Sequence, residues 1–325
     1  MATKESDLIS NAIENFDAQQ IRARVAWFYF VGGMTQQEIA DHLGMTRLRV
    51  NKILVQIRAD GSVVVDIRLP MAKCVDLESR LMERFRLEHA CVTPTLPDEA
   101  ENQRAIGEAA GTVLDELLVD GMGLGVGWGR TLTAGLKRIT PRSLANSWVT
   151  SIMGGLTRGS GSSTFEVATG YAKAISAECW YLTAPLYFPS PESREALLGH
   201  HGIRETMHRA NSVDVALVSC GDMSSRSQLI QTPTVSENLD TLLKAGAVGD
   251  LLGVFLDQGG LPIDHPLNER VLSLSPEKLK SVRHTVLASG GLNKVDMIRA
   301  ILRAGYVKRI VTDEDCASAL LESPA

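Results

Sequence analysis

Four loops rich in glycine give this 325-residue chain its clearest capacity to hold a small polar ligand. Glycine lets the backbone approach a ligand closely, and the neighbouring polar side chains supply hydrogen-bond donors, acceptors and positive charge. The loops are GVGWGRTL (125–132), MGGLTRGSG (153–161), CGDMSSRSQL (220–229) and SGGLNK (289–294). Their polar groups include Thr131, Thr157, Arg158, Asp222, Ser224, Ser225, Arg226, Asn293 and Lys294. Together these groups would suit a polyhydroxyl compound or its phosphate.

Each loop also has a purely structural interpretation, since glycine-rich turns between strands and helices often serve backbone geometry alone. Arg158 and Lys294 fit either a ligand contact or an ion pair at the surface or between subunits. Trp128 could stack on the face of a sugar or cap the core. The loops therefore favour a ligand site by their repetition rather than singly.

A further segment contains a group of acidic residues and a histidine, namely Asp250, Asp257, Asp264 and His265. Such a group invites a metal or acid–base interpretation, but its spacing matches no metal-ligand pattern. Gly259 and Gly260, followed by Leu261 and Pro262, are instead typical of a hairpin turn. We predict no metal site, no cofactor and no catalytic dyad.

A second chemical feature lies near the N-terminus, in TQQEIADHLGMTRLRVNKILVQIRADG from Thr35. Thr35 with Glu38 forms a capping box that starts a short helix, and Thr46 caps a second one. Ala40 is small enough for two helices to cross closely, and Gly44 follows in the turn. Apolar positions recur every three or four residues in both segments, which is the spacing of a helix-turn-helix.

The outer face of the second helix is basic, with no acidic residue between Thr46 and Ala59. Arg, Asn and Gln can bond to guanine or adenine edges in the major groove, while Lys and Thr can hold phosphates. The alternative is a solvated basic helix without a partner. The residues that we assign to operator DNA are Thr35, Gln36, Thr46, Arg47, Arg49, Asn51 and Lys52.

Four segments organise these features. Residues 1–20 form a polar N-terminal tail, and residues 21–69 form the helix-turn-helix domain. The end of this domain is a short strand in SVVVDIRLP (62–70), which Pro70 terminates and which forms a wing or pairs elsewhere. Residues 70–88 form a connector helix with Val75, Leu77, Leu81 and Phe85 on one apolar face, a plausible dimer contact. Residues 89–325 form the effector domain.

The effector domain alternates short β-rich runs with helical stretches. This alternation predicts an α/β fold with a mainly parallel sheet covered by helices, in which ligands bind beyond the carboxyl ends of the strands. Among the elements, we expect a helix over about 165–180, a strand over 181–188 and another at RVLSL (270–274).

Composition limits the class of protein. Hydrophobic residues at 44% and charged residues at 22% describe a globular chain, and the stretches of apolar residues are too short to cross a bilayer. Cytoplasmic location is the expectation, with no membrane partner. The five cysteines lack metal-ligand spacing and are expected to be free thiols. A net charge of -5 still permits a local basic face.

With these motifs in order, the chain resembles the SorC family of bacterial sugar-responsive transcription regulators, grouped with the DeoR-type repressors. The resemblance spans nearly the whole chain. It rests on GGMTQQEIADHLGMTRLRVNKIL, GVGWGRTL, MGGLTR, GDMSS, AVGDLLGVFLD and SGGLNKVDMIRAILRAGYVKRIVTDEDCASALL. It implies a winged helix-turn-helix and an effector domain shaped like sugar-phosphate isomerases, assembled into homodimers or homotetramers.

The resemblance also implies a sugar, polyol or sugar phosphate as effector. The contacts carried over by position are Gly125, Gly127, Trp128, Gly129, Arg130, Thr131, Thr157, Arg158, Asp222, Asp250 and Lys294. Two departures stand out: the extension before Ile21 is long, and Trp128 crowds a loop that phosphate-binding members often keep small. The second departure favours an unphosphorylated effector.

The sequence therefore predicts a regulator, specifically a repressor, of a carbohydrate or polyol catabolic operon. The alternatives are a sugar-phosphate isomerase, because the expected fold is also used by enzymes, and an architectural DNA-binding protein without a ligand. The polar loops disfavour the last of these.

Overall fold

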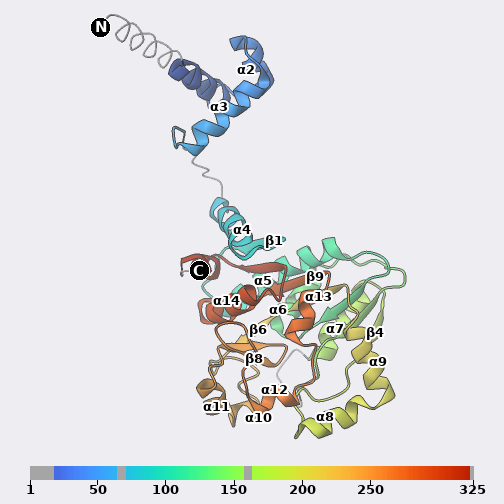
Figure 1. The fold of residues 1–325 in the computed structure, drawn as a ribbon. Coiled ribbons are helices and arrows are strands. Elements are labelled where there is room, and N and C mark those ends of the chain that lie inside the picture. The colour runs from blue at the N-terminus through green and yellow to red at the C-terminus, as the bar shows by residue number, and fades with distance from the viewer. Residues whose placement is uncertain (1–17, 64–70, 157–162, 323–325) are drawn as a thin grey trace, which may run out of the picture. The chain divides into compact units, whose positions relative to one another are not determined.

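The computed structural model describes residues 18–63, 71–156 and 163–322 (Figure 1). The chain forms two compact units, Met1–Leu69 and Pro70–Ala325. Several predictions lie outside the described residues: most of the N-terminal tail, most of the strand SVVVDIRLP, and the ligand contacts Thr157 and Arg158.

The described part of the first unit, residues 18–63, contains three helices, over residues 18–30, α2 (Gln36–Leu43) and α3 (Arg47–Ala59). The predicted capping box is present, because the Thr35 hydroxyl accepts from the Glu38 N–H and the Glu38 carboxylate accepts from the Thr35 N–H at 2.7 Å. Gly44 ends α2 in the left-handed conformation at φ 63°, which glycine adopts without steric cost. Local sequence signals thus set the bend between α2 and α3.

One small apolar core holds these helices together. Its buried members are Val25, Ile39, Ala40, Val50, Ile53, Leu54 and Ile57. They come from all three helices and recur at helical spacing in α3, so each helix buries one face and leaves the other exposed. Ala40 is only 1% exposed, as expected of a residue at a close helix crossing.

The second unit is built on a seven-stranded sheet whose neighbouring strands are all parallel. In spatial order the strands are β1 (His89–Thr93), β10 (Arg309–Asp313), β9 (His284–Ala288), β5 (Val215–Val218), β2 (Gly123–Val126), β3 (Trp148–Ser151) and β4 (Glu178–Trp180). Both faces are buried, because Val215 and Leu217 enter one core cluster while Ala216 and Val218 enter another. The predicted α/β fold with a mainly parallel sheet is confirmed.

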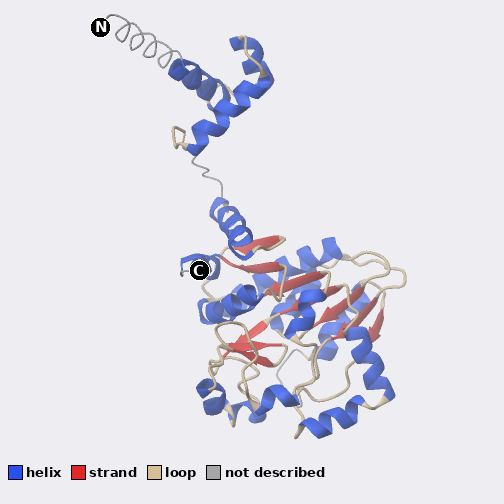
Figure 2. Ribbon diagram, viewed as in Figure 1, coloured by secondary structure: helices blue, strands red, loops and turns tan. Residues whose placement is uncertain are grey.

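Helices cover both faces of this sheet (Figure 2). The core on one face includes residues of α5 (Glu99–Leu117), α6 (Arg130–Gly135) and α7 (Thr164–Ala174). The core on the other includes residues of α4 (Ala72–Phe85), α14 (Val295–Ala304) and α15 (Glu314–Glu322). The remaining helices are η1 (Leu136–Arg138), α8 (Pro191–Leu198), α9 (His201–Ala210), α10 (Pro233–Ser236), α11 (Leu239–Lys244), α12 (Pro266–Arg270), α13 (Pro276–Ser281) and η2 (Leu292–Lys294).

A small antiparallel sheet was not predicted. It consists of β6 (Cys220–Asp222), β7 (Gly249–Leu251) and β8 (Val254–Leu256). Three other expectations were wrong. The helix over 165–180 ends at Ala174, because Ser176 adopts a positive φ of 51° and β4 follows. Residues 181–188 and 270–274 form isolated bridges rather than strands.

The connector helix α4 packs within the second unit instead of presenting an open apolar face. Leu77 and Leu81 are buried against β1 and α15 together with Cys74. Of the predicted apolar face, Val75 is the residue that stays largely exposed. Leu77 and Leu81 are therefore not available for a dimer contact.

Glycine at two positions of α5 lets α6 pack against it at short range. A Cβ on Gly107 would lie 2.1 Å from the Thr131 carbonyl oxygen, and a Cβ on Gly111 would lie 2.1 Å from the Gly135 carbonyl oxygen. Both oxygens belong to the backbone, so neither can move alone. This contact fixes the start of α6, where Arg130 and Thr131 lie.

We expect Gly107→Ala to lower the free energy of unfolding by about 1–3 kcal/mol, because α6 must shift to admit the methyl group. Thermal or urea unfolding measures this change. The exposed Thr112→Ala in the same helix should change stability by less than about 0.5 kcal/mol. Equal stability of the two variants would show that α5 and α6 do not pack this closely.

Candidate functional site

A pocket lies where the order of the parallel strands reverses. From β2 the chain runs outward through β3 to β4, and from β5 it runs the other way through β9 to β10. In open α/β sheets, ligands bind at such a switch point, beyond the carboxyl ends of the strands. Here Gly127 follows β2 and Ser219 follows β5, and both line the pocket.

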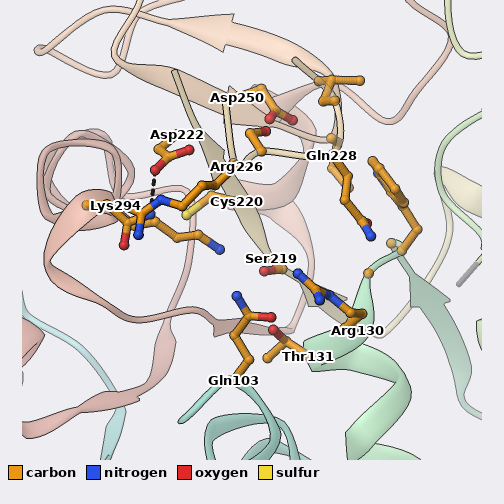
Figure 3. Close-up of a pocket in the computed structure, with 18 of the residues that line it drawn as sticks. Gln103, Arg130, Thr131, Ser219, Cys220, Asp222, Arg226, Gln228, Asp250 and Lys294 are labelled. Atoms are coloured by element: carbon orange, nitrogen blue, oxygen red, sulfur yellow. Dashed lines mark hydrogen bonds between the residues drawn. The ribbon is translucent and has the colours of Figure 1, made fainter. Parts of the chain in front are cut away.

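The pocket encloses a cavity of about 100 Å³ and is open to solvent at its mouth. Figure 3 shows polar side chains from several segments turned toward this space. Its lining comprises Glu99, Gln103, Gly127, Trp128, Gly129, Arg130, Thr131, Met153, Ser219, Cys220, Gly221, Asp222, Arg226, Ser227, Gln228, Leu229, Asp250, Leu252, Asn293 and Lys294. Polar groups outnumber apolar ones.

Asp222, at the end of β6, is one of two buried carboxylates in the lining. Its oxygens accept from the Ser224 hydroxyl at 2.9 and 3.0 Å and from the Asn293 amide. The bond from Asn293 ties β6 to η2, which follows β9 (Figure 3). Asp222 is therefore held in a fixed orientation by two different segments.

Asp250, in β7, is the second buried carboxylate. It accepts from the Gly253 N–H at 3.0 Å. Burial raises the pKa of Asp250 to about 6, and the negative charge of Asp222 adds to the rise, while the Gly253 N–H and the charge of Lys294 act against it. Opposite it, a Cβ on Gly221 would come within 2.3 Å of an Asp250 carboxylate oxygen, so glycine makes room for this carboxylate.

The shifted pKa of Asp250 predicts a dependence of stability on pH. Between about pH 4 and 6 the folded chain keeps a proton that the unfolded chain releases, so the free energy of unfolding contributed by Asp250 falls as pH rises. The change is about 3 kcal/mol at most. Unfolding at several pH values, compared with the non-titrating Asp250→Asn, measures it. Parallel profiles for the two proteins would contradict the shift.

Cations and one aromatic ring complete the lining. Lys294 lines the pocket with the buried groups (Figure 3). Its charge lowers the pKa of Asp250 and of the Cys220 thiol, whose pKa burial nonetheless raises to about 11. Arg226 pairs with Glu99 at 3.3 Å, and Arg130 is exposed. Trp128 is half-buried, so part of its ring can contact a ligand.

The structure brings most of the predicted ligand residues together. Those that line the pocket are Gly127, Trp128, Gly129, Arg130, Thr131, Asp222, Asp250 and Lys294. Gly125 lies elsewhere, inside β2, where a Cβ would meet the Ile152 side chain at 2.5 Å. That glycine is explained by packing between strands and not by a pocket.

Sequence reasoning missed several lining residues. Ser219 directly follows the apolar run of β5, and this position was a usable signal. Gln103 and Glu99 come from α5, more than 100 residues before Asp222 in the chain. No local pattern distinguishes these two side chains from ordinary polar residues of a helix.

The group around His265 has a structural role. The His265 Nδ1 accepts from the Leu267 N–H at 3.2 Å at the start of α12, and its Nε2 lies 2.9 Å from the Thr241 hydroxyl. Within the described ranges, no group of three or more His, Cys, Asp or Glu side chains could hold a metal ion. The five cysteines are free thiols, all buried or half-buried.

A second candidate site is the outer face of α3. Thr46, Arg47, Arg49, Asn51 and Lys52 are all exposed on it. Gln36, from the first turn of α2, donates from its amide to the Asn51 side-chain oxygen at 3.4 Å. The predicted DNA-binding residues of α2 and α3 thus lie on one continuous surface of the first unit.

Comparison with known proteins identifies the family of this chain. Residues 70–322 match the Sugar-bind family model, described as "Putative sugar-binding domain". The chain is 31% identical over 305 residues to the Erythritol catabolism regulatory protein EryD of Brucella abortus (strain 2308), covering 93% of this chain and 96% of that protein. The chain belongs to the SorC family. The predicted resemblance is confirmed.

Two further relatives agree with this SorC-family assignment. The Transcriptional regulator LsrR of Escherichia coli O9:H4 (strain HS) is 31% identical over 307 residues, 93% of this chain and 94% of that one. The full-length Sorbitol Operon Regulator SorC of Klebsiella pneumoniae superposes with a TM-score of 0.74 at 26% identity, covering 94% of this chain and 100% of that one. The chain is therefore a transcriptional regulator with a sugar-binding domain, and these relatives give no support to the isomerase alternative.

Among the described helices, none is both long and apolar enough to cross a membrane.

Proposed function

We propose that this SorC-family regulator binds a sugar, polyol or sugar phosphate in the pocket of its second unit, and that the bound effector changes its affinity for operator DNA. The observation that carries the proposal is the pair of buried carboxylates, Asp222 and Asp250, beside Lys294 in a pocket at the switch point of the sheet. Buried charges are costly unless they are paired or hydrogen-bonded, so their presence in a pocket favours a ligand with several donors.

The chemistry of the lining favours a compound with adjacent hydroxyl groups. Carboxylates accept hydrogen bonds from hydroxyls, and Lys294 donates to their oxygens. Trp128 offers an apolar ring face, which suits the C–H face of a sugar. The names of two relatives refer to erythritol and to the sorbitol operon. These names support polyols as the first compounds to test, ahead of their phosphates.

For DNA, we propose that the outer face of α3 enters the major groove and that the Thr35 and Thr46 ends of α2 and α3 lie near phosphates. A helix-turn-helix commonly acts as a pair that spans two half-sites, so the working unit is a homodimer or homotetramer. A cytoplasmic location is part of this proposal, because operator DNA is the proposed partner. Repression of a catabolic operon is the regulatory outcome that we propose.

A thermal-shift screen of the full chain against sugars, polyols and their phosphates tests the effector proposal. A ligand at about 100 times its dissociation constant stabilises the folded state by about 2.7 kcal/mol, so one chemical class should raise the unfolding temperature by several degrees. If only the phosphorylated compounds stabilise the chain, the effector is a sugar phosphate or polyol phosphate. If no member of the panel stabilises the chain, the pocket is not a carbohydrate site.

A further inference from the structure

Leu48 has the highest exposed fraction, 78%, among the large apolar side chains that the structure describes. It is the second residue of α3, whose N-cap is Thr46. A single exposed leucine is ordinary on a protein surface. Its position is what matters, because residues in the first turns of a recognition helix are those that reach base edges.

The geometry of α3 places Leu48 directly opposite the core. Successive residues turn by about 100° around an α-helix, and the buried face of α3 consists of Val50, Ile53, Leu54 and Ile57. The opposite side consists of Leu48, Asn51, Lys52 and Val55, all exposed. Arg47 and Arg49 lie roughly 100° to either side of Leu48. The centre of the outer face therefore carries two apolar side chains, one amide and the Lys52 ammonium, and the two arginines flank it.

This arrangement separates two kinds of DNA contact. When a helix lies in the major groove, side chains on its flanks face the phosphate backbones, and those at the centre face the bases. An uncharged branched side chain gains nothing from phosphates. The group in the groove that it can contact favourably is the C5-methyl of thymine.

Asn51 supports this orientation from the next turn of α3. Its side-chain oxygen accepts from the Gln36 amide at 3.4 Å, which restrains the Asn51 amide on the same side of the helix as Leu48. A carbonyl oxygen has two lone pairs, so Asn51 can still accept from a base while its NH₂ donates. If Leu48 faces the bases, the Asn51 amide is therefore held where it can reach them as well.

We propose that Leu48 is a specificity-determining residue that packs on the C5-methyl of a thymine in each operator half-site. The proposal rests on the proposed DNA-binding function and goes beyond it, because it assigns one base feature to one side chain. Arg47 and Arg49 then contribute affinity that depends little on sequence, and Leu48 contributes discrimination.

The test begins with the full chain and a randomised duplex library, from which bound sequences are selected. In the selected duplex, each thymine is then replaced by deoxyuridine, which lacks only the methyl group. For the wild type, one replacement per half-site should weaken binding about 4-fold, which corresponds to the free energy of burying one methyl group. Leu48→Ala should bind the thymine and deoxyuridine duplexes equally.

Leu261→Ala is the matched control, since it makes the same substitution at an exposed leucine of the second unit. It should keep the wild-type loss on deoxyuridine substitution, and unfolding curves should match for all three proteins. The proposal for Leu48 is overturned if no deoxyuridine replacement in the selected duplex weakens binding, or if Leu48→Ala loses as much affinity on replacement as the wild type does. Neither result would affect the proposed DNA-binding function. Failure to select any duplex would overturn the DNA-binding function together with the proposal for Leu48.

Discussion

Asp250→Asn is expected to weaken effector binding about 10- to 100-fold, the largest effect that we predict for a single substitution in the pocket. The Asp250 carboxylate is buried and accepts from the Gly253 N–H, and the Gly221 N–H also lowers its pKa. An amide must turn its NH₂ toward one of its partners, and it loses the charge that strengthens bonds from ligand hydroxyls, about 1.5–3 kcal/mol. Calorimetric titration with the compound found in the thermal screen measures the change.

Asp264→Asn provides the control because Asp264 is exposed and lies outside the pocket lining. Its affinity for the effector should equal that of the wild type. DNA binding without effector should be the same in both variants, since Asp250 lies in the second unit. Wild-type effector affinity in Asp250→Asn would place the ligand away from the buried carboxylates.

The triple variant Arg47→Ala, Arg49→Ala, Lys52→Ala should bind operator DNA at least about 100-fold more weakly than the wild type at near-physiological salt. Each lost phosphate contact removes counterion release, so the slope of log affinity against log salt should fall in magnitude by about one unit per contact. Fluorescence anisotropy of labelled duplex across a salt series measures both quantities.

A second triple variant distinguishes the effect of the α3 face on DNA binding from the effect of the protein's net charge. Lys173→Ala, Lys244→Ala, Arg283→Ala removes the same formal charge from exposed positions of the second unit. Its affinity and salt slope should stay near those of the wild type. Equal loss in both triple variants would mean that overall charge, and not the face of α3, governs binding to DNA.

The first unit could be predicted closely because its signals are local. The Thr35 and Glu38 capping box, the turn at Gly44 and the buried positions of α3 each depend on residues a few places apart. The alternation of buried strands with helices in the second unit is also visible along the chain. These features need no knowledge of distant contacts.

The errors came from contacts between distant segments. The strands of the small sheet are three residues long, and β6 pairs with β7 across 26 intervening residues, so neither carries a pattern of its own. Gly125 was assigned to the ligand because the family resemblance carries over the whole loop from Gly125 to Thr131, but its lack of a side chain accommodates Ile152. A glycine needed for packing and one needed for a ligand look alike in sequence.

The central claim is that the pocket and the DNA-binding face are coupled, and titration of operator duplex with and without saturating effector tests it most directly. Coupling between two sites is typically worth about 5- to 150-fold in affinity. We predict a change of that size in the wild type, and in Asp250→Asn the same change only at effector concentrations about 10- to 100-fold higher. If the effector binds the wild type in the pocket and the affinity for operator DNA stays the same, the account is contradicted.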